Sequence, residues 1–523
     1  MKKNIKNNIS IVWFKRDLRI TDHAPLNNGL ENQHLLCLYV YENSSFGGTE
    51  ITNQHLFIEE SLNSLREGLN KLGLKLEIQY GEVTEILEML NCEYNLQQIF
   101  SHEETGDLKS YKRDMIVRKW CQYNQVNWIQ YPTNGVIRGL KDRNLWSKYW
   151  RQRVGGPIMP TPKHVRKSSV VLPNTFSTKP SWMASPYLRK ATNELRQKGY
   201  QHELSKRIEM FVNKDCQYYS QGMSSPLTAP YACSRLSPYL SLGMVSIREI
   251  YIITQEQLLE LKQIKNPDAT SKAKIKSLNS FIRRLHWRCH FIQKLEMEPS
   301  IEVSAIHPSY DEVYANSTND DLLRSWQIGA TGYPFIDACM RYLIHHGWIN
   351  FRMRAMLTSF SSYTLHNDWK DTASWLGKIF TDYEPGIHFP QIQMQSGITG
   401  INTLRIYNPV KQGLDFDANG LFIKKWIPEL KLLPECFIHQ PWLMSKTIQK
   451  KYGVILDREY PSPVVNHTIN SKLMAAKIYS IKRQIKTKEI ARKVYEKHGS
   501  RNLNQRHKRI KPSNPNQRAL IFE

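Results

Sequence analysis

The residues with the clearest chemical potential lie within residues 331–409. Arg352 and Arg354 interrupt an otherwise apolar helical segment, and Asp382 and Glu384 follow in a loop rich in Pro and Gly. Because a buried guanidinium needs an anionic partner, these carboxylates are the obvious candidates. The pair is either a structural link beneath a loop or the closure of a cofactor pocket.

A second stretch, SSPLTAPYACSRLSPYLSLGMVS, places Ser234, Arg235 and Ser237 ahead of a helix that contains Tyr239 and Leu240. Hydroxyls, backbone N–H groups and a guanidinium at a helix start suit a phosphate or pyrophosphate. Serine at a helix start is also common for purely structural reasons, so this stretch alone is a weak signal.

A third stretch, SFIRRLHWRCHFIQKLE, carries charge and aromatic rings on one helix face. Arg284, Trp287, Arg288 and Phe291 fall three or four residues apart. An aromatic face beside arginine can hold a planar base or ring. The alternative is a core tryptophan flanked by surface arginines.

The elements that must position these residues are mostly helices. Residues 201–470 predict an all-α domain, with long amphipathic segments over Glu203–Val212, Ile247–Leu261, Ala273–Glu298, Thr331–His346 and Asn350–Leu365. Pro334 suits the first turn of the fourth of these helices, because its missing N–H has no helical partner there.

Residues 1–132 predict an open α/β domain with a doubly wound parallel sheet. Short β-rich runs (ISIVWF, LLCLYVY, LKLEIQYG, LQQIFSHEE and NWIQYP) alternate with helical patterns over Asn53–Gly73, Val83–Leu90 and Lys109–Asn124. FKRDLRITDH follows the first strand where a nicotinamide dinucleotide site would carry GxGxxG, which argues against such a site.

Composition predicts an interdomain linker over residues 133–200, because Pro, Ser and basic residues replace the regular alternation. Residues 471–523 are strongly basic, with a helix predicted over Lys472–Tyr495 and a disordered end after it. Its apolar stripe, formed by Met474, Ile478, Ile481 and Ile485, predicts that the helix docks by one face.

The chain of 523 residues has 72 Lys and Arg against 47 Asp and Glu, which favours a polyanionic partner such as nucleic acid. A solvated tail could account for much of this excess. The eight cysteines contain no CxxC pair, so we expect no disulfide framework, zinc site or iron–sulfur cluster. With no apolar run long enough for a membrane span and no secretion signal, we expect a cytoplasmic monomer.

Together and in this order, the motifs resemble the photolyase/cryptochrome family up to about residue 470. They are VWFKRDLRITDHAPL, CSRLSPYLSLG, TGYPFIDACMRYL, GWINFRMR and RIYNPVKQGLDFDANGLFIKKWIPEL. The resemblance implies an α/β domain that can hold an antenna pigment, either folate or deazaflavin, and a helical domain that holds FAD. The site near His102, Glu103 and Glu104 is where an open sheet binds ligands.

The resemblance also implies residue roles. FAD contacts are expected from Tyr219, Ser234, Arg235, Leu236, Ser237, Arg288, Trp348, Arg354, Asp382, Glu384 and His388. Trp287 matches the position that stacks on a flipped-out pyrimidine dimer, and Arg352 and Lys411 are expected to contact DNA phosphates. Arg354 and Asp382 are expected to form an ion pair beside the flavin ring, in which the Asp382 carboxylate would compensate the charge of Arg354.

Four positions depart from the family pattern in or near the substrate pocket. Arg284 stands where the family usually has a Glu before the stacking Trp, and Phe351 stands where it usually has an Asn. Ala355 replaces a Met that packs on the dimer, and His388 occupies the position that faces flavin N5. His388 either donates a proton near N5 or only fills space and hydrogen-bonds a carbonyl.

The tryptophan chain for electron transfer is also altered. Trp369 matches its middle member, but Ile392 and Asn316 stand at the flavin-proximal and surface positions. Replacement aromatics are Trp375, Tyr363 and Tyr383, which could equally be packed core rings. The paired histidines of the animal-type (6-4) enzymes are absent from INFRMRAMLTSF.

The resemblance implies a blue-light-driven DNA lyase that splits cyclobutane pyrimidine dimers. Trp287, Arg284, His388 and Trp369 are its candidate catalytic residues, and damaged DNA is its partner. The alternative is a cryptochrome-type photoreceptor, which would need a signalling partner. A weaker third reading is a nucleic-acid-binding flavoprotein without photochemistry.

Overall fold

A computed structural model describes residues 7–42, 52–163, 170, 172, 196–315 and 317–499. Its N-terminal part is a five-stranded parallel sheet in the order β3-β2-β1-β4-β5. The strands are β1 (Asn8–Phe14), β2 (Leu35–Tyr41), β3 (Leu76–Tyr80), β4 (Asn95–His102) and β5 (Asn127–Tyr131). This confirms the predicted doubly wound domain and all five predicted strands.

Helices cover both faces of the sheet. They are α1 (Ala24–Gly29), α2 (Asn53–Lys71), α3 (Val83–Glu93) and α4 (Leu108–Tyr123). Successive strand residues point to opposite faces, so Ile11 packs with α3 and α4, whereas Val12 packs with α1 and α2. The core that contains Val12 continues into the helical part through Tyr239 and Leu285. One apolar core therefore joins the two parts of the molecule.

The segment predicted as a linker is partly helical. Residues 143–154 form a 3₁₀ turn, η1 (Arg143–Leu145), and helix α5 (Trp146–Val154). Trp146, Trp150 and Val154 recur at helical spacing and are buried in the core that joins the two parts. Burial of these large rings outweighs the irregular composition around them. Residues 164–169, 171 and 173–195 lie outside the described part.

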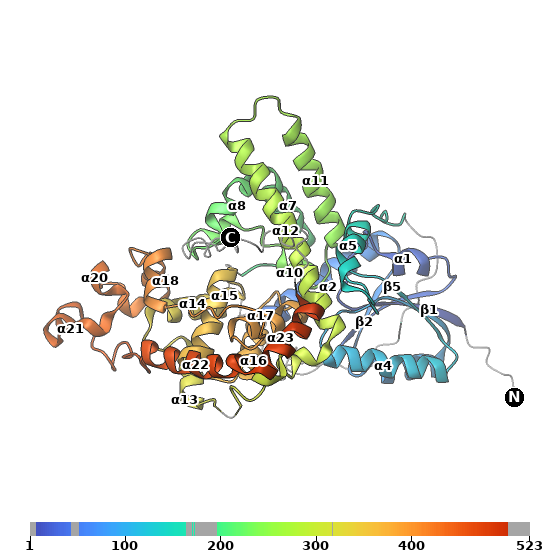
Figure 1. The fold of residues 1–523 in the computed structure, drawn as a ribbon. Helices are drawn as coiled ribbons and strands as arrows, with labels where there is room; N and C mark the ends of the chain where they lie inside the picture. Colours follow the sequence, from blue (N-terminus) through green and yellow to red (C-terminus); the bar gives the residue numbers. More distant parts are fainter. Residues whose placement is uncertain are drawn as a thin grey trace, which may run out of the picture.

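The rest of the described chain is helical, as predicted (Figure 1). Its first elements are α7 (Gln201–Met210), the π-turn η3 (Phe211–Asp215), α8 (Cys216–Gly222), α9 (Ala229–Ala232), α10 (Ser237–Ser241), α11 (Ile247–Gln263), α12 (Ala269–Met297), η4 (Pro299–Glu302), η5 (Pro308–Tyr310), α13 (Asp320–Ile328), α14 (Pro334–His346) and α15 (Phe351–Ser359).

The later elements are the π-turn η6 (Phe360–Thr364), α16 (Trp369–Ile379), α17 (Pro385–Gln395), α18 (Pro409–Phe416), α19 (Leu421–Trp426), η7 (Pro428–Leu430), α20 (Glu435–Ile438), η8 (Pro441–Leu443), α21 (Lys446–Tyr452), α22 (His467–Arg483) and α23 (Ile485–His498). In the described part of the chain, no helix is long and apolar enough to cross a membrane.

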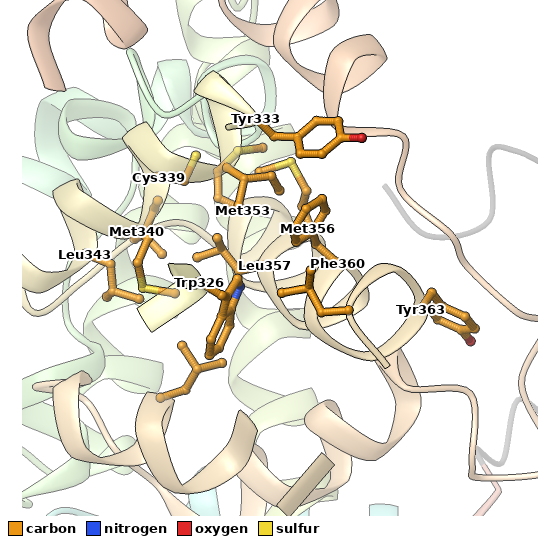
Figure 2. Packing of buried hydrophobic residues seen from close by; sticks show 14 of the residues in the cluster. Trp326, Tyr333, Cys339, Met340, Leu343, Met353, Met356, Leu357, Phe360 and Tyr363 are labelled. Carbon is orange, nitrogen blue, oxygen red and sulfur yellow. The ribbon is translucent and has the colours of Figure 1, made fainter. Parts of the chain in front are cut away.

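The core of the helical part is built around α14 and α15. Figure 2 shows Trp326 of α13 beside Met340 and Leu343 of α14 and Leu357 of α15. All four side chains are fully buried. Because α15 is packed on this apolar side, its arginines are held at fixed positions for the site described below.

The basic C-terminal region is two helices rather than one. Helix α22 ends where Gln484 adopts an extended ψ of 138°, and α23 begins at the next residue. Met474 and Ile478 are buried as predicted, but Ile485 is 77% exposed because it lies beyond the break. The docked stripe is therefore confined to α22, and residues 500–523 lie outside the described part.

Candidate functional site

The predicted pair of Arg354 and Asp382 forms a two-pronged ion pair. Arg354 Nη1 donates to Asp382 Oδ1 at 3.0 Å, and Nη2 donates to Oδ2 at 2.9 Å. Arg354 Nε donates to the Ile349 carbonyl at 2.7 Å, and the guanidinium lies 4.1 Å from the Phe380 ring centroid. This fork geometry fixes both groups, and the carboxylate balances the charge of a guanidinium held largely out of water.

The loop that carries Asp382 is fixed by the end of α14. Gly347 caps that helix at φ 66°, and its carbonyl accepts a hydrogen bond from the Thr381 N–H at 2.8 Å. A Cβ on Gly347 would lie 2.1 Å from Thr381 Oγ1. Only glycine allows both the left-handed cap and this close approach.

Glu384 lies between two arginines from different parts of the molecule. Its Oε2 accepts from Arg288 Nη2 of α12 at 2.9 Å and from Arg16 Nη2 of the α/β domain at 3.1 Å. Arg16 also donates to the carbonyls of Ser241 and Tyr383. Burial alone would lower the pKa of Arg16, but the combined charges of Glu384, Glu104 and Asp107 raise it above its ordinary value.

Sequence reasoning missed Arg16. The signal was present, because KRD follows β1 at the carboxyl end of a parallel sheet, where ligand and interface residues gather. Nothing local in the sequence links this residue to Glu384, which lies 368 positions further along the chain.

Helix α17 approaches α12 closely where it positions these groups. A Cβ on Gly386 would lie 2.5 Å from the Cα of Ile292, a backbone atom that cannot rotate away. Pro385 occupies the first turn of α17, where its missing N–H has no helical partner. Gly386 therefore sets the distance between Glu384 and Arg288.

The predicted phosphate loop contains a buried arginine in an uncommon conformation. Arg235 has φ 56°, and its guanidinium stacks 4.0 Å from the ring centroid of Trp348. Burial lowers the pKa of Arg235. Its Nε has no hydrogen-bond partner among the described residues, and no carboxylate there forms an ion pair with it. A cation held in this way fits an anionic ligand.

The neighbours of Arg235 are arranged for the same role. Ser234 and Ser237 are half-buried and Leu236 is buried, with Ser237 opening the short helix α10. Tyr219 on α8 is buried against Phe211 and Phe281. The structure brings the loop beside Trp348, as the predicted cofactor contacts require.

The predicted substrate face lies on α12. Trp287 is half-buried, with its ring centroid 5.0 Å from that of His290 and 5.7 Å from that of Phe291. Arg284 is exposed, and Arg288 is turned inward to Glu384 and to the Leu240 carbonyl. The helix thus directs Arg288 to Glu384, whereas Arg284, although exposed, shares a hydrogen bond with the side chain of Tyr219.

His388 is neutral and already hydrogen-bonded. Its Nε2 lies 2.8 Å from the Ala373 carbonyl, which can only accept, so Nε2 carries the proton. Burial lowers its pKa to about 4, although that carbonyl favours the protonated ring. Nδ1 is therefore the unprotonated nitrogen near pH 7. The structure thus shows the carbonyl hydrogen bond that was one of the two alternatives for His388, and proton donation near flavin N5 stays a prediction.

The predicted DNA contacts differ in exposure. Lys411 is exposed and lies 3.5 Å from Asp415. Arg352 is half-buried, with its guanidinium 5.0 Å from the Phe416 ring centroid. Of the two altered positions nearby, Phe351 is 51% exposed whereas Ala355 is buried in α15. Phe351 is thus the replacement that a ligand at this surface would meet.

The candidate electron-transfer rings are buried, but no continuous ring-to-ring path among them is described. Trp369 and Tyr363 are fully buried, and Ile392 packs in the same core. Tyr383 lies 5.3 Å from His388 between ring centroids. Trp375 is partly buried against the core, and Asn316 lies outside the described residues. The replacement path stays a prediction.

The carboxyl edge of the sheet holds a buried hydrogen-bonded triad. His23 Nε2 and His102 Nδ1 both bond to Asp17 Oδ2, at 3.0 and 2.7 Å. The pKa of His102 is about 3, because burial disfavours its charged form. Glu104 pairs instead with Arg113 of α4. All three predicted antenna residues, His102, Glu103 and Glu104, line the space between the two parts of the molecule.

That space includes a cavity of about 210 Å³. Its lining includes His102, Tyr131, Arg16, Arg19, Arg153 and Arg248. Burial lowers the pKa of both Arg19 and Arg153. The cavity is therefore basic and partly desolvated, which suits an anionic group.

Comparison with known proteins accounts for this arrangement. Residues 10–139 match the family model of DNA photolyase, and residues 281–480 match the model of the FAD-binding domain of DNA photolyase. The chain belongs to the photolyase/cryptochrome family. The second match contains Trp287, Arg288, Trp348, the Arg354–Asp382 pair and Glu384, whereas Tyr219 and the loop of Arg235 precede it.

The similar proteins include both photo-lyases and cryptochromes by name. A deoxyribodipyrimidine photo-lyase of Alkalihalophilus pseudofirmus is 27% identical over 89% of this chain and 97% of its own. A cryptochrome DASH of Gloeobacter violaceus is 28% identical over 87% of this chain and 93% of its own. The crystal structure of an archaeal photolyase from Sulfolobus tokodaii with two FAD molecules has a TM-score of 0.71, at 23% identity over 90% and 100% of the two chains.

The residues present fit FAD. Arg235 supplies a buried guanidinium that lacks an anion, and the Arg354–Asp382 pair supplies a fixed polar group elsewhere in the same domain. A diphosphate would compensate the first, and the edge of a flavin ring can bond to the second.

Proposed function

We propose that the protein is a blue-light-driven, FAD-dependent lyase that splits cyclobutane pyrimidine dimers in DNA. Trp287 carries the proposal: it is an indole held half-buried on α12, one residue before the arginine that anchors Glu384. A half-buried aromatic ring beside a cofactor pocket suits a planar base turned out of the duplex. The chain is 27% identical to a photo-lyase over 89% of its length, and this similarity supports the same activity.

Several side chains have separate roles in this proposal. Arg235, with Ser234 and Ser237, would hold the diphosphate of FAD, and Arg354 with Asp382 would hold the edge of its ring. Reduced FAD would supply, on absorbing blue light, the electron that splits the dimer and takes it back afterwards. Trp287 would position the dimer by stacking.

The direct test is repair by the purified, reduced holoprotein under blue light. Thymine-dimer DNA should lose its dimers in the light and keep them in the dark. Trp287→Ala should lower affinity for that DNA by about 5- to 150-fold through loss of about 1–3 kcal/mol of stacking, whereas Trp287→Phe should retain most of it. Absence of repair on both single-stranded and duplex substrates would refute the proposal.

The second candidate function is a cryptochrome-type photoreceptor. Three observations favour it: Arg284 is exposed, Phe351 is exposed in place of an amide, and His388 presents an unprotonated nitrogen. A photoreceptor should change the protease sensitivity of its C-terminal region on illumination. A dimer-splitting enzyme without a signalling role should show the same digestion pattern in light and dark.

The basic cavity between the two parts is our candidate for an antenna pigment. The arginines of this cavity favour a ligand with a carboxylate or phosphate, which folate, deazaflavin cofactors and a second FAD all have. The archaeal photolyase named above, which holds two FAD molecules, supports an antenna within this fold. An absorbance spectrum of the native protein, followed by release and identification of its pigments, tests this assignment.

A further inference from the structure

Helices α11 and α12 form an arm. Figure 1 shows the two helices rising together out of the body and joining at a loop at the tip. Helix α12 has 29 residues, which corresponds to about 43 Å at 1.5 Å per residue. Its lower part carries Trp287 and Arg288, so the arm is a continuation of the predicted substrate face.

One face of α12 is exposed along the arm. Four exposed residues of this face follow one another at intervals of four, three and four residues: Lys272, Lys276, Asn279 and Arg283. This spacing places them on one stripe of the helix, and Trp287 comes four residues after Arg283 on the same side. The opposite face, with Leu278 and Leu285, is buried in the core that includes α11.

The stripe is positively charged and uncompensated. Among the described residues, Lys272, Lys276 and Arg283 form no ion pair. Asp268, the nearest acid in sequence, caps α12 by accepting a hydrogen bond from the Ser271 N–H. Lys274, in contrast, turns away and donates to the Asn213 carbonyl.

The dimensions match a nucleic-acid backbone. Fifteen residues separate Lys272 from Trp287, or about 22 Å along the helix. One DNA strand presents a phosphate about every 3.4 Å of duplex axis, so the stripe spans roughly six base pairs. Lysine and arginine on an exposed helix face can neutralise these phosphates without reading sequence.

We propose that the stripe Lys272–Lys276–Arg283 binds the phosphates of duplex DNA that runs away from the base held at Trp287. This deepens the proposed function and rests on it for the position of the lesion. The arm would add affinity and orientation without contacting the lesion, so its contribution should depend on the length of the flanking duplex and on salt.

The test compares two double variants of the arm with equal charge change. K272Q/K276Q removes two charges from the stripe, and K262Q/K265Q removes two exposed lysines from the end of α11 and the tip. Binding is measured by fluorescence anisotropy with a central thymine dimer, in a duplex of about 30 base pairs and in one that ends about two base pairs from the dimer. Each titration is repeated over a range of salt concentrations.

For the long duplex, we expect K272Q/K276Q to weaken binding about 10-fold near 0.1 M salt and to reduce the salt slope by about 1.8. The short duplex should bind the variant and the wild type equally, and K262Q/K265Q should match the wild type on both. Equal behaviour of the two variants on the long duplex would overturn the proposal, as would a loss that is the same on the short duplex.

These readouts separate the arm from the chemistry. If the wild-type protein repairs dimers and K272Q/K276Q binds the long duplex as tightly as the wild type, the proposed function stands and the role of the stripe in binding DNA is refuted. Stripe-dependent binding by a protein that repairs nothing would support the arm and refute the lyase. Wild-type protein that binds neither duplex would overturn both.

Discussion

Two buried arginines of the helical part have opposite electrostatic situations. Arg354 has a carboxylate within the chain, Asp382, which meets it with two hydrogen bonds. Arg235 stacks on the ring of Trp348 and shares a hydrogen bond with the Tyr342 side chain, and no carboxylate forms an ion pair with it in the described part of the chain. The first is complete as the protein folds, whereas the second is complete only with an anion from outside. We therefore expect the Arg354–Asp382 pair to matter more for the stability of the apoprotein, and Arg235 to matter more for the affinity of an anionic ligand.

The largest expected effect follows from breaking the Arg354–Asp382 ion pair. Asp382→Asn leaves the charge of Arg354 without its carboxylate in a mostly buried position, which should lower the free energy of unfolding by about 3 kcal/mol. Urea unfolding of the apoprotein measures it. The double variant Asp382→Asn/Arg354→Met should recover much of the loss, since it removes the unpaired charge. A single variant as stable as the wild type would contradict this account of Arg354.

Arg235 should behave in the opposite way. Arg235→Gln removes a charge that burial already disfavours, so the unfolding free energy of the apoprotein should change by less than about 1 kcal/mol. Its affinity for FAD should fall about 10-fold or more, because a charge-assisted bond to phosphate is lost. Quenching of flavin fluorescence on binding measures this affinity. A destabilised apoprotein with unchanged FAD affinity would remove the distinction between the two arginines.

The sequence predicted what depends on local pattern. The five strands are uninterrupted β-rich runs. Arg354 and Asp382 both lie in motifs of the family, and the resemblance implies that these two residues pair. The sequence did not predict Arg16 beside Glu384, because that contact depends on how two domains pack. The contact between Arg16 and Glu384 leaves no periodic signal in the sequence. Helix α5 was also not predicted, although Trp146, Trp150 and Val154 recur at helical spacing, because the composition around them resembles a linker.

The break after α22 has the same cause. Apolar residues continue at helical spacing through Ile485, so the pattern alone predicts one helix. The backbone turns at Gln484 because the remaining segment packs elsewhere: the Thr487 carbonyl bonds to His307, and His498 pairs with Glu298. Propensity and periodicity are overridden here by two polar anchors that are distant in the sequence.

The smallest expected effect concerns His388, which is electrostatically coupled to Arg354 and Asp382. The pKa of His388 is about 4 in the folded protein, below the ordinary value of 6.5 for histidine, and the charge of Arg354 adds to the effect of burial. Below pH 6.5 the unfolded chain therefore binds a proton that the folded chain excludes, so stability should fall as the pH drops from 6.5 towards 4.

His388→Asn should remove its share of this dependence. The slope of unfolding free energy against pH should decrease by up to about 1.4 kcal/mol per pH unit between pH 6 and 5, measured by urea unfolding at each pH. His202→Asn is the matched control, because its ring is exposed and its loss should leave the slope unchanged. An unchanged slope for His388→Asn would mean that the folded protein holds a charged imidazole beside Arg354. The surroundings of the Arg354–Asp382 pair would then carry an excess positive charge. Arg354, like Arg235, would lie in a region whose positive charge is not balanced by carboxylates of the chain.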